Sequence, residues 1–272
     1  MAKSGQLVEK RQIGKYSNMG SVILCAGRGG TGKSTFVTLA SRCLNSPKLL
    51  IDLDPDESLA DMLGIDLEEK GKKTISAMLY EFIRERAGRS GYNLFSELLS
   101  RILDECLYRD EGFDFISLGT KFAVGCYCAP DAVLKDFMPT VVQDYEEVLI
   151  DSPAGLEHFN RKVVVDIDDL FVLLDPSEKS VKHIERVLDI TKELKVNYNH
   201  FYLVGNHGFT EETQEYLRST GGTYLGKIEY DGEVKEYNLK GKSLLGLPEN
   251  SPALHSVKEV LAKAGLIYED RV

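Results

Sequence analysis

Short apolar runs recur along the whole chain, and most of them stop at a glycine or an aspartate. Strands of a parallel sheet have this pattern, because helices cover both of their faces. The runs therefore predict the strands of a mostly parallel sheet. Their ranges are 21–26, 47–54, 112–119, 146–153, 170–177, 200–206 and 223–230.

Segments with helical character fill the intervals between these runs. In one of them Ile75, Met78, Leu79 and Phe82 fall at i, i+3, i+4 and i+7, which places them on one helix face. Strands that alternate with helices predict a doubly wound α/β fold with helices on both sheet faces. Ligands of such sheets bind at the carboxyl ends of the strands. The expected helices are 33–45, 74–87, 92–108, 131–142, 178–195, 211–219 and 252–264.

The bulk composition fits one globular domain, expected over residues 20–272 after a polar extension at 1–19. A net charge of −10 argues against nucleic-acid and anionic-membrane partners. The first 20 residues lack the apolar stretch of a secretory signal, and Ala2 excludes myristoylation at that position. Five cysteines without such a signal indicate a reducing compartment, so the expected location is cytoplasmic.

The first predicted strand is followed by a complete phosphate-binding motif, G-x-x-x-x-G-K-[ST], and then by a predicted helix. Glycines let backbone N–H groups surround phosphate oxygens, and the helix N-terminus adds positive potential. The lysine can neutralise β- and γ-phosphate charge, and the serine hydroxyl can bind Mg²⁺. The motif predicts a Mg²⁺–nucleotide site at Gly27, Arg28, Gly29, Gly30, Thr31, Gly32, Lys33, Ser34 and Thr35.

Arg28 makes this motif more specific. The segment resembles the deviant loop G-K-G-G-x-G-K-[ST] of the ATPase class that contains nitrogenase iron protein and the cell-division and partition ATPases. The resemblance implies a homodimer in which the cation at Arg28 reaches the partner's phosphates. Arginine keeps the charge of the usual lysine and could stabilise transition-state charge. The alternative is a solvated loop arginine.

Three carboxylates follow strand ends. Alternation along a strand places Asp52 and Asp54 on one side, toward the phosphates, where a carboxylate can orient water or hold Mg²⁺. Resemblance to the deviant-loop class selects Asp54 as the water-positioning residue. Asp56 is expected to cap the next helix. Asp151 ends an apolar strand, as a Mg²⁺-associated Walker B aspartate does. The segment 151–155 resembles the D-S-P-A-G switch, which implies that the backbone near Gly155 senses the γ-phosphate.

Asn206 ends a later strand, in the segment Asn206-His207-Gly208-Phe209. The guanine-reading motif N-K-x-D would need a lysine and an aspartate that this segment lacks. In the deviant-loop class an asparagine at this point contacts adenine. The sequence therefore favours ATP over GTP.

Cys126 and Cys128 form a C-x-C pair just before a predicted helix, whose N-terminus would favour the thiolate form of Cys128. Two thiolates supply half of the four ligands that Zn²⁺ usually takes. A symmetric dimer could supply the other two and bridge Zn²⁺ or Ni²⁺ between subunits. Cys25, Cys43 and Cys106 are expected to pack instead. The alternative is two unligated thiols in a turn.

The C-x-C pair, followed by Asp151-Ser152-Pro153-Ala154-Gly155-Leu156-Glu157-His158, resembles the CooC-type ATPases over roughly residues 20–250. These proteins assist nickel insertion into carbon monoxide dehydrogenase. The chain departs from that family at Arg28 and Pro153. The resemblance implies a dimeric Mg²⁺-dependent ATPase that serves a client nickel enzyme. Two alternatives remain: a localisation switch like the MinD and ParA ATPases, and an electron donor like nitrogenase iron protein.

Overall fold

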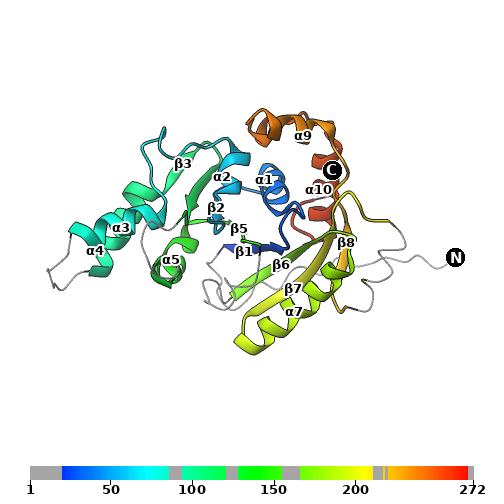
Figure 1. Cartoon of the computed structure of the whole chain (residues 1–272), viewed down its shortest axis with the longest axis horizontal. Helices are drawn as coiled ribbons and strands as arrows, with labels where there is room; N and C mark the ends of the chain where they lie inside the picture. Colours follow the sequence, from blue (N-terminus) through cyan, green and yellow to red (C-terminus); the bar gives the residue numbers. More distant parts are fainter. Residues whose placement is uncertain are drawn as a thin grey trace.

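The computed structural model describes residues 20–85, 94–120, 128–154, 166–210, 217 and 220–268. Eight strands form one sheet in the order β3-β4-β2-β5-β1-β6-β7-β8. All neighbouring strands are parallel except β3 and β4. This confirms the predicted doubly wound, mostly parallel α/β fold (Figure 1). The strands are β1 Ser21–Gly27, β2 Lys48–Asp52, β3 Tyr108–Asp110, β4 Phe113–Ser117, β5 Glu147–Asp151, β6 Asp166–Leu174, β7 Asn197–Gly205 and β8 Thr223–Lys227.

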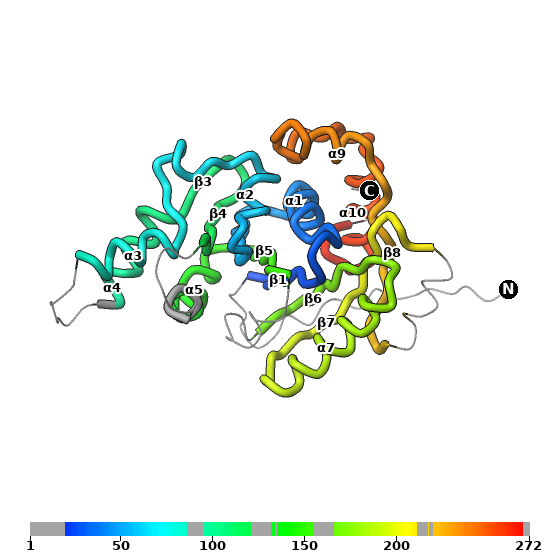
Figure 2. The backbone as a smooth tube through the Cα atoms, in the orientation of Figure 1, coloured from blue at the N-terminus to red at the C-terminus, as the bar shows by residue number. Residues whose placement is uncertain are grey.

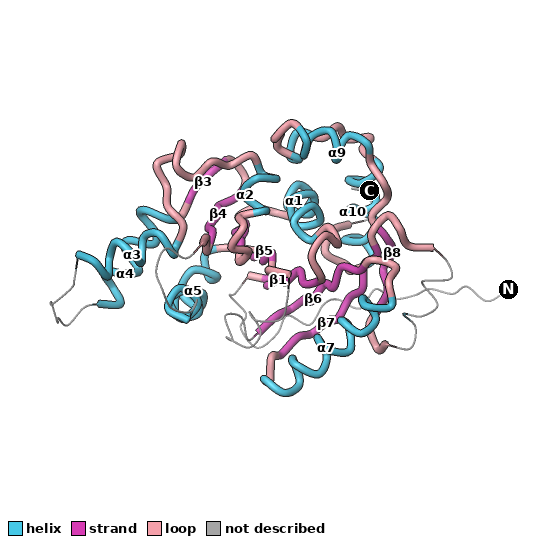
Figure 3. The backbone as a smooth tube through the Cα atoms, in the orientation of Figure 1, coloured by secondary structure: helices cyan, strands magenta, loops and turns pink. Residues whose placement is uncertain are grey.

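Helices cover both faces of the sheet, as Figure 3 shows by the helices on either side of the band of strands. One face packs against α1, α2 and α10, and the other against α3, α5 and α7. None of the described helices is long and apolar enough to cross a membrane. The helices are α1 Lys33–Cys43, α2 Ser58–Leu63, α3 Ile75–Glu85, α4 Leu94–Arg101, α5 Cys128–Val141, α7 Glu178–Leu194, α9 Gly232–Leu239 and α10 Pro252–Lys263.

Strand β1 shows why the apolar runs are continuous. Val22, Leu24 and Ala26 belong to the core on one face of the sheet, whereas Ile23 and Cys25 belong to the core on the other. Since successive side chains of a strand point to opposite faces, a strand covered on both sides must be apolar at every position. Figure 2 shows β1 in the middle of the sheet, between β5 and β6. The carboxyl end of β1 is therefore central in the molecule.

The predicted helix at 92–108 is confirmed from Leu94 to Cys106, but it changes type within this range and ends two residues early. Helix α4 ends at Arg101, a π-helical turn spans Ile102–Cys106, and Tyr108–Asp110 then form β3. Strand β3 pairs antiparallel with β4 across a tight turn that contains Gly112, whose φ is +94°. Three residues are too few to show the alternation of a strand, so the sequence pattern did not separate β3 from the helix.

Other boundaries also differ from the prediction. Strand β6 begins four residues earlier than predicted, and β7 begins three residues earlier. The added residues are mostly polar and join the two strands: Asn197 Nδ2 donates to Asp166 Oδ1 at 2.8 Å, and Asn199 Nδ2 donates to Asp168 Oδ1 at 2.9 Å. For α2 the sequence predicted only a cap at Asp56 and no range, and α9 was not predicted. The strand predicted at 223–230 ends at Lys227. The helix predicted at 211–219 lies, except for Leu217, outside the described residues.

Candidate functional site

The phosphate loop connects the central strand β1 to α1, and its backbone requires glycine. Gly27 has a φ of +151°, and a Cβ there would lie 2.5 Å from the carbonyl oxygen of Leu173 on β6. Gly32, the residue before α1, has a φ of +95°. Side chains at these positions would bring strain or a clash. The glycines of the motif thus let the loop turn sharply between two buried elements.

Lys33 is buried within the loop that it belongs to. Its Nζ donates a hydrogen bond to the carbonyl oxygen of Arg28 at 3.1 Å, and the hydroxyl of Thr31 donates to the same oxygen at 2.8 Å. Only 6 % of Lys33 is exposed. The ammonium group is therefore held by a neutral acceptor, which an anionic phosphate oxygen can replace favourably.

The guanidinium of Arg28 is bound to its own subunit. Its Nη1 lies 3.0 Å from Asp175 Oδ2, and it also donates to Ser177 Oγ at 3.2 Å. Burial alone would raise the pKa of Asp175, but hydrogen bonds from Ser177 and Ser180 together with the charge of Arg28 hold that pKa below its usual value. The contact ties the phosphate loop to the turn between β6 and α7.

Asp151 at the end of β5 is an unusually isolated carboxylate. It is fully buried, and within the described ranges neither of its oxygens has a partner in hydrogen-bonding geometry. Burial raises its pKa to about 7, although Ser34 and Lys33 act in the opposite direction; the charge of Asp54 raises it further. An orphaned carboxylate beside the motif serine and lysine is suited to an oxygen-binding cation such as Mg²⁺.

Asp52 lies opposite Asp151 on the neighbouring strand, but its carboxylate is bound by backbone N–H groups. Its carboxylate accepts from the backbone N–H groups of Asp54 at 2.9 Å and Leu59 at 2.9 Å, and so holds the start of α2. Burial, followed by the charge of Asp151, raises its pKa well above the usual value. Because β2 ends at Asp52, the alternation expected to bring Asp52 and Asp54 to the same side does not continue.

The prediction that Asp56 caps the next helix is wrong. Asp56 is exposed, Glu57 is the residue before α2, and the carboxylate that accepts the helix N–H groups belongs to Asp52. Asp54 is half-buried, and its Oδ1 accepts from the N–H of Asp56 at 3.1 Å. The short turn thus leaves the second carboxylate oxygen of Asp54 without a hydrogen bond from the described part of the chain.

A cavity of about 490 Å³ adjoins the phosphate loop and contains Asn206 in its wall. The Oδ1 atom of Asn206 accepts from the N–H of Gly208 at 3.0 Å, which uses the amide oxygen and leaves the amide nitrogen available to donate to a ligand. A volume of this size suits a nucleoside. The cavity is lined by Gly30, Thr31, Gly32, Thr35, Asn206, His207, Ile228, Glu229, Tyr230, Asp231, Val234, Lys235, Asn238, Leu239 and Ala253.

The far wall of this cavity was missed by the sequence interpretation. It is formed by the segment after β8 and by α9, including Tyr230, Val234 and Asn238. The sequence contained one clue to α9, the order Asp-Gly-Glu at 231–233, which is typical of a helix start. In the structure the side chain of Asp231 caps this helix by accepting from the N–H of Glu233 at 2.8 Å. Apolar residues are sparse in α9, so hydrophobic periodicity alone did not reveal it.

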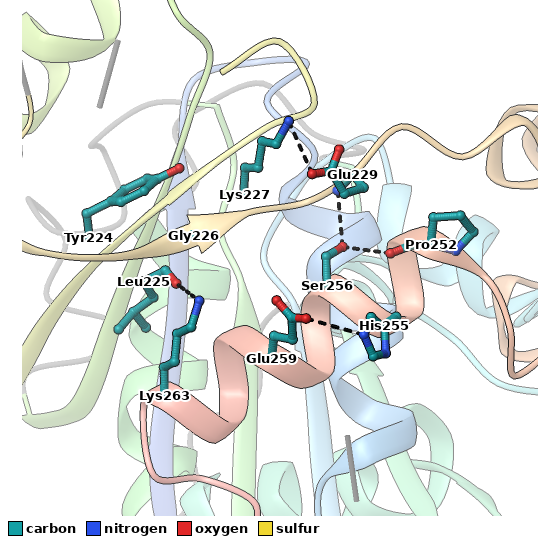
Figure 4. A pocket seen from close by; sticks show the side chains of 10 residues that line it. All are labelled: Tyr224, Leu225, Gly226, Lys227, Glu229, Pro252, His255, Ser256, Glu259 and Lys263. Atoms are coloured by element: carbon teal, nitrogen blue, oxygen red, sulfur yellow. Dashed lines mark hydrogen bonds and ion pairs between the residues drawn. The ribbon is translucent and has the colours of Figure 1, made fainter. Parts of the chain in front are cut away.

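A second, larger cavity of about 580 Å³ lies between β8 and α10 (Figure 4). Its charged groups already have partners. Lys227 pairs with Glu229 at 3.2 Å, His255 Nε2 lies 3.3 Å from Glu259 Oε1, and Lys263 donates to the carbonyl oxygen of Leu225 at 2.9 Å. The contact of Lys263 joins the edge strand β8 to α10. Since the charged groups of this cavity have partners, the smaller cavity beside the phosphate loop is the better nucleotide site.

The predicted metal ligands can be placed only in part. Cys126, like the switch residue Gly155, lies outside the described residues, and Cys128 is the first residue of α5. Cys25 and Cys106 are buried and Cys43 is half-buried, in agreement with packing roles. Where the structure is described, no three His, Cys, Asp or Glu residues cluster in a way that could hold a metal ion.

The central strand, the glycine-rich loop with its lysine, and the buried aspartate on the next strand together define a P-loop ATPase. Comparison with known proteins specifies the family. A family profile described as AAA domain matches residues 20–202, and the chain belongs to this family of MinD- and ParA-like P-loop ATPases. ATP and Mg²⁺ are the expected ligands of such an ATPase.

Several relatives are similar over most of the chain. An uncharacterized ATP-binding protein of Methanocaldococcus jannaschii is 32% identical over 248 residues, which cover 89% of this chain and 97% of that protein. The carbon monoxide dehydrogenase accessory protein CooC of Rhodospirillum rubrum is 27% identical over 64% of this chain and 70% of its own length. The septum site-determining protein MinD of Bacillus subtilis is 22% identical, with coverages of 86% and 85%.

Solved structures agree with this fold. The MinD cell division protein of Aquifex aeolicus is similar with a TM-score of 0.63 at 19% sequence identity. The match covers 90% of this chain and 97% of that one. At this level of identity the similarity concerns the fold alone.

Proposed function

We propose that this ATPase is a dimeric maturation factor that couples ATP turnover to nickel insertion or metallocentre assembly in a client enzyme. One observation carries the proposal: a C-x-C sequence, whose second cysteine is the first residue of α5, occurs in a chain that is similar to the CooC accessory protein. The positive N-terminal end of a 14-residue helix favours the thiolate form of a cysteine placed there. Thiolates are the form that binds Zn²⁺ or Ni²⁺.

The nucleotide chemistry follows from the groups around the phosphate loop. In this proposal Lys33 exchanges the Arg28 carbonyl for phosphate oxygens, and Asn206 contacts the base. Ser34 and Asp151 hold Mg²⁺, while Asp54 orients the attacking water. The metal ion supplies charge neutralisation for the phosphates. The orphaned oxygens of Asp151 support its part, because a cation would relieve the buried negative charge.

Arg28 is assigned to the dimer. Its contact with Asp175 holds the guanidinium at the loop, on a side chain that remains 35% exposed. We propose that the partner's nucleotide draws Arg28 away from Asp175, so that ATP binding and dimerisation are coupled. Gly155, four residues beyond Asp151, would report the γ-phosphate to the interface.

The alternative is a localisation switch like MinD, favoured by the similarity to the Bacillus subtilis protein. A switch that binds a membrane through a helix needs an apolar helix face that is not buried in the protein. In α10 the apolar residues Leu254, Val257 and Leu261 are buried in the core beside α1. Helix α10 is therefore committed to the fold, which supports the maturation role over a switch that uses α10 on a membrane.

Metal analysis of protein purified without oxygen tests the proposal. We expect one Zn²⁺ or Ni²⁺ per dimer, lost in the double variant Cys126→Ser and Cys128→Ser while ATP binding is kept. Cys43→Ser is the matched control, since it removes a half-buried thiol from α1 and should retain the metal. One metal per monomer in a monomeric fraction would contradict a bridging site. No metal after reconstitution would contradict the maturation role and favour the switch.

A further inference from the structure

A basic pocket of about 420 Å³ opens beside the beginning of the phosphate loop. One wall is formed by Arg28 and Gly29 of the loop and by Ala154, which follows β5. The other wall is a single face of α7, because its four residues are spaced at i, i+3, i+4 and i+7. These α7 residues are Lys179, Lys182, His183 and Arg186.

The basic pocket holds more positive charge than its neighbours neutralise. Arg28 is paired with Asp175 at 3.0 Å, and Lys182 is paired with Glu178 at 2.7 Å. Lys179 and Arg186 have no ion pair with any residue that the structure describes. Two of the four cations are therefore left to attract an anion, which matches the charge of a hydrogen phosphate dianion.

His183 provides a second, independent indication of a ligand. Only 7% of the residue is exposed, and its Nε2 atom is buried with no hydrogen-bond partner among the described residues. Burial lowers the pKa of His183, and the nearby charges of Arg28, Lys33 and Arg186 lower it further, so the ring is neutral near pH 7. An unpaired buried ring nitrogen costs free energy that a hydrogen-bonding ligand would recover.

The position of the basic pocket suggests which anion it receives. The nucleoside cavity lies at the Asn206 side of the loop, and Lys33 lies within the loop. The nucleotide end farthest from the base therefore faces Gly29 and Ala154; a Cβ on Gly29 would lie 3.5 Å from the Cβ of Ala154. Hydrolysis would release phosphate at this end.

We propose that the basic pocket binds the inorganic phosphate that ATP hydrolysis releases, with Lys179, Arg186 and His183 as its ligands. Phosphate there would also compete with Asp175 for the guanidinium of Arg28. Departure of the product is thereby linked to the contact between the phosphate loop and α7. The proposal uses the ATPase activity of the family and is independent of the metal that the maturation role requires.

Titration of the full chain with inorganic phosphate, in the presence of Mg²⁺ and saturating ADP, tests the proposal. Calorimetry should show phosphate binding that is about tenfold weaker or more in the double variant Lys179→Ala and Arg186→Ala, since two unneutralised charges are removed. ADP affinity should stay unchanged. Lys192→Ala is the matched control, because Lys192 is an exposed lysine of the same helix outside the basic pocket.

A second readout observes the ligand directly. Phosphate should shift the ¹⁵N ring signals of His183 in the wild-type chain but not in the double variant. Equal phosphate affinity in the two proteins would overturn the proposal, and so would a wild-type chain that binds no phosphate. If an acidic peptide bound instead and the double variant abolished its binding, the basic pocket would be a docking site for another protein and the proposal would be wrong.

Discussion

Replacing Asp151 with asparagine should change how stability depends on pH. Its pKa rises from an ordinary 3.8 to about 7 in the folded state, mainly through burial. The folded state thus holds this proton more tightly than the unfolded chain does. The resulting contribution to the free energy of unfolding is complete below pH 4 and is lost as the pH rises to about 7. At about 1.4 kcal/mol per pKa unit, the loss is about 4 kcal/mol.

Asparagine removes this titration but introduces its own cost. A carboxamide at a site without hydrogen-bond partners should cost about 1–3 kcal/mol at every pH. At pH 4.5 the wild-type chain has already lost about 1 kcal/mol, so the variant should be less stable by up to about 2 kcal/mol; at pH 8 it should be more stable by about 1–3 kcal/mol. Loss of the negative charge also eases the ionisation of Asp52, which adds to the higher stability of the variant at pH 8.

Urea unfolding of the nucleotide-free protein at pH 4.5, 6 and 8, followed by far-UV circular dichroism, measures both curves. Asp189→Asn on the exposed side of α7 is the control and should leave the pH dependence unchanged. The reasoning is refuted if Asp151→Asn shifts stability by the same amount at all three pH values. That outcome would mean that the carboxylate ionises in the folded protein as easily as in the unfolded chain.

Five further substitutions test individual side chains. Asp52→Ala should lower the free energy of unfolding by about 2–4 kcal/mol in urea, because buried N–H groups at the start of α2 lose their acceptor. The control Asp56→Ala, at an exposed residue, should change this free energy by less than about 0.5 kcal/mol. Asp54→Asn should retain Mg²⁺–ATP binding in fluorescence titrations and slow phosphate release by orders of magnitude; unchanged turnover would move the water-positioning role elsewhere. Arg28→Ala should weaken ATP-dependent dimerisation in sedimentation experiments, and Asp175→Ala should strengthen it; the dimer role fails if neither variant has an effect.

The layered fold was predictable because its signals are local and repeated. A strand covered on both faces must be apolar throughout, and the glycine-rich loop occurs only where β1 meets α1. Strand β3 and the early residues of β7 escaped prediction, because hydrogen bonds to a neighbouring strand stabilise them rather than burial of their own side chains; early β6 escaped because polar residues alternate there with the buried Ile167. Such pairing between distant segments leaves no periodicity in the sequence.

The candidate site was also predicted only in part. The motif predicted a phosphate loop between β1 and α1, and the strand ends predicted site roles for Asp151 and Asn206, since parallel strands bring their carboxyl ends to one edge. The sequence could not show that Asp52 supports α2, because that depends on β2 ending at this residue. Nor could it show the contact between Arg28 and Asp175, which joins residues 147 positions apart.

The central place of β1 constrains how the chain can fold during synthesis. Its two neighbours are β5, which begins at Glu147, and β6, which begins at Asp166, so β1 has no strand to pair with until the ribosome has made more than half of the protein. At the usual speed of translation this interval lasts on the order of ten seconds. Throughout it, a strand with apolar side chains on both faces must be kept from aggregating, which makes the nascent chain a natural client for chaperones that bind exposed strands.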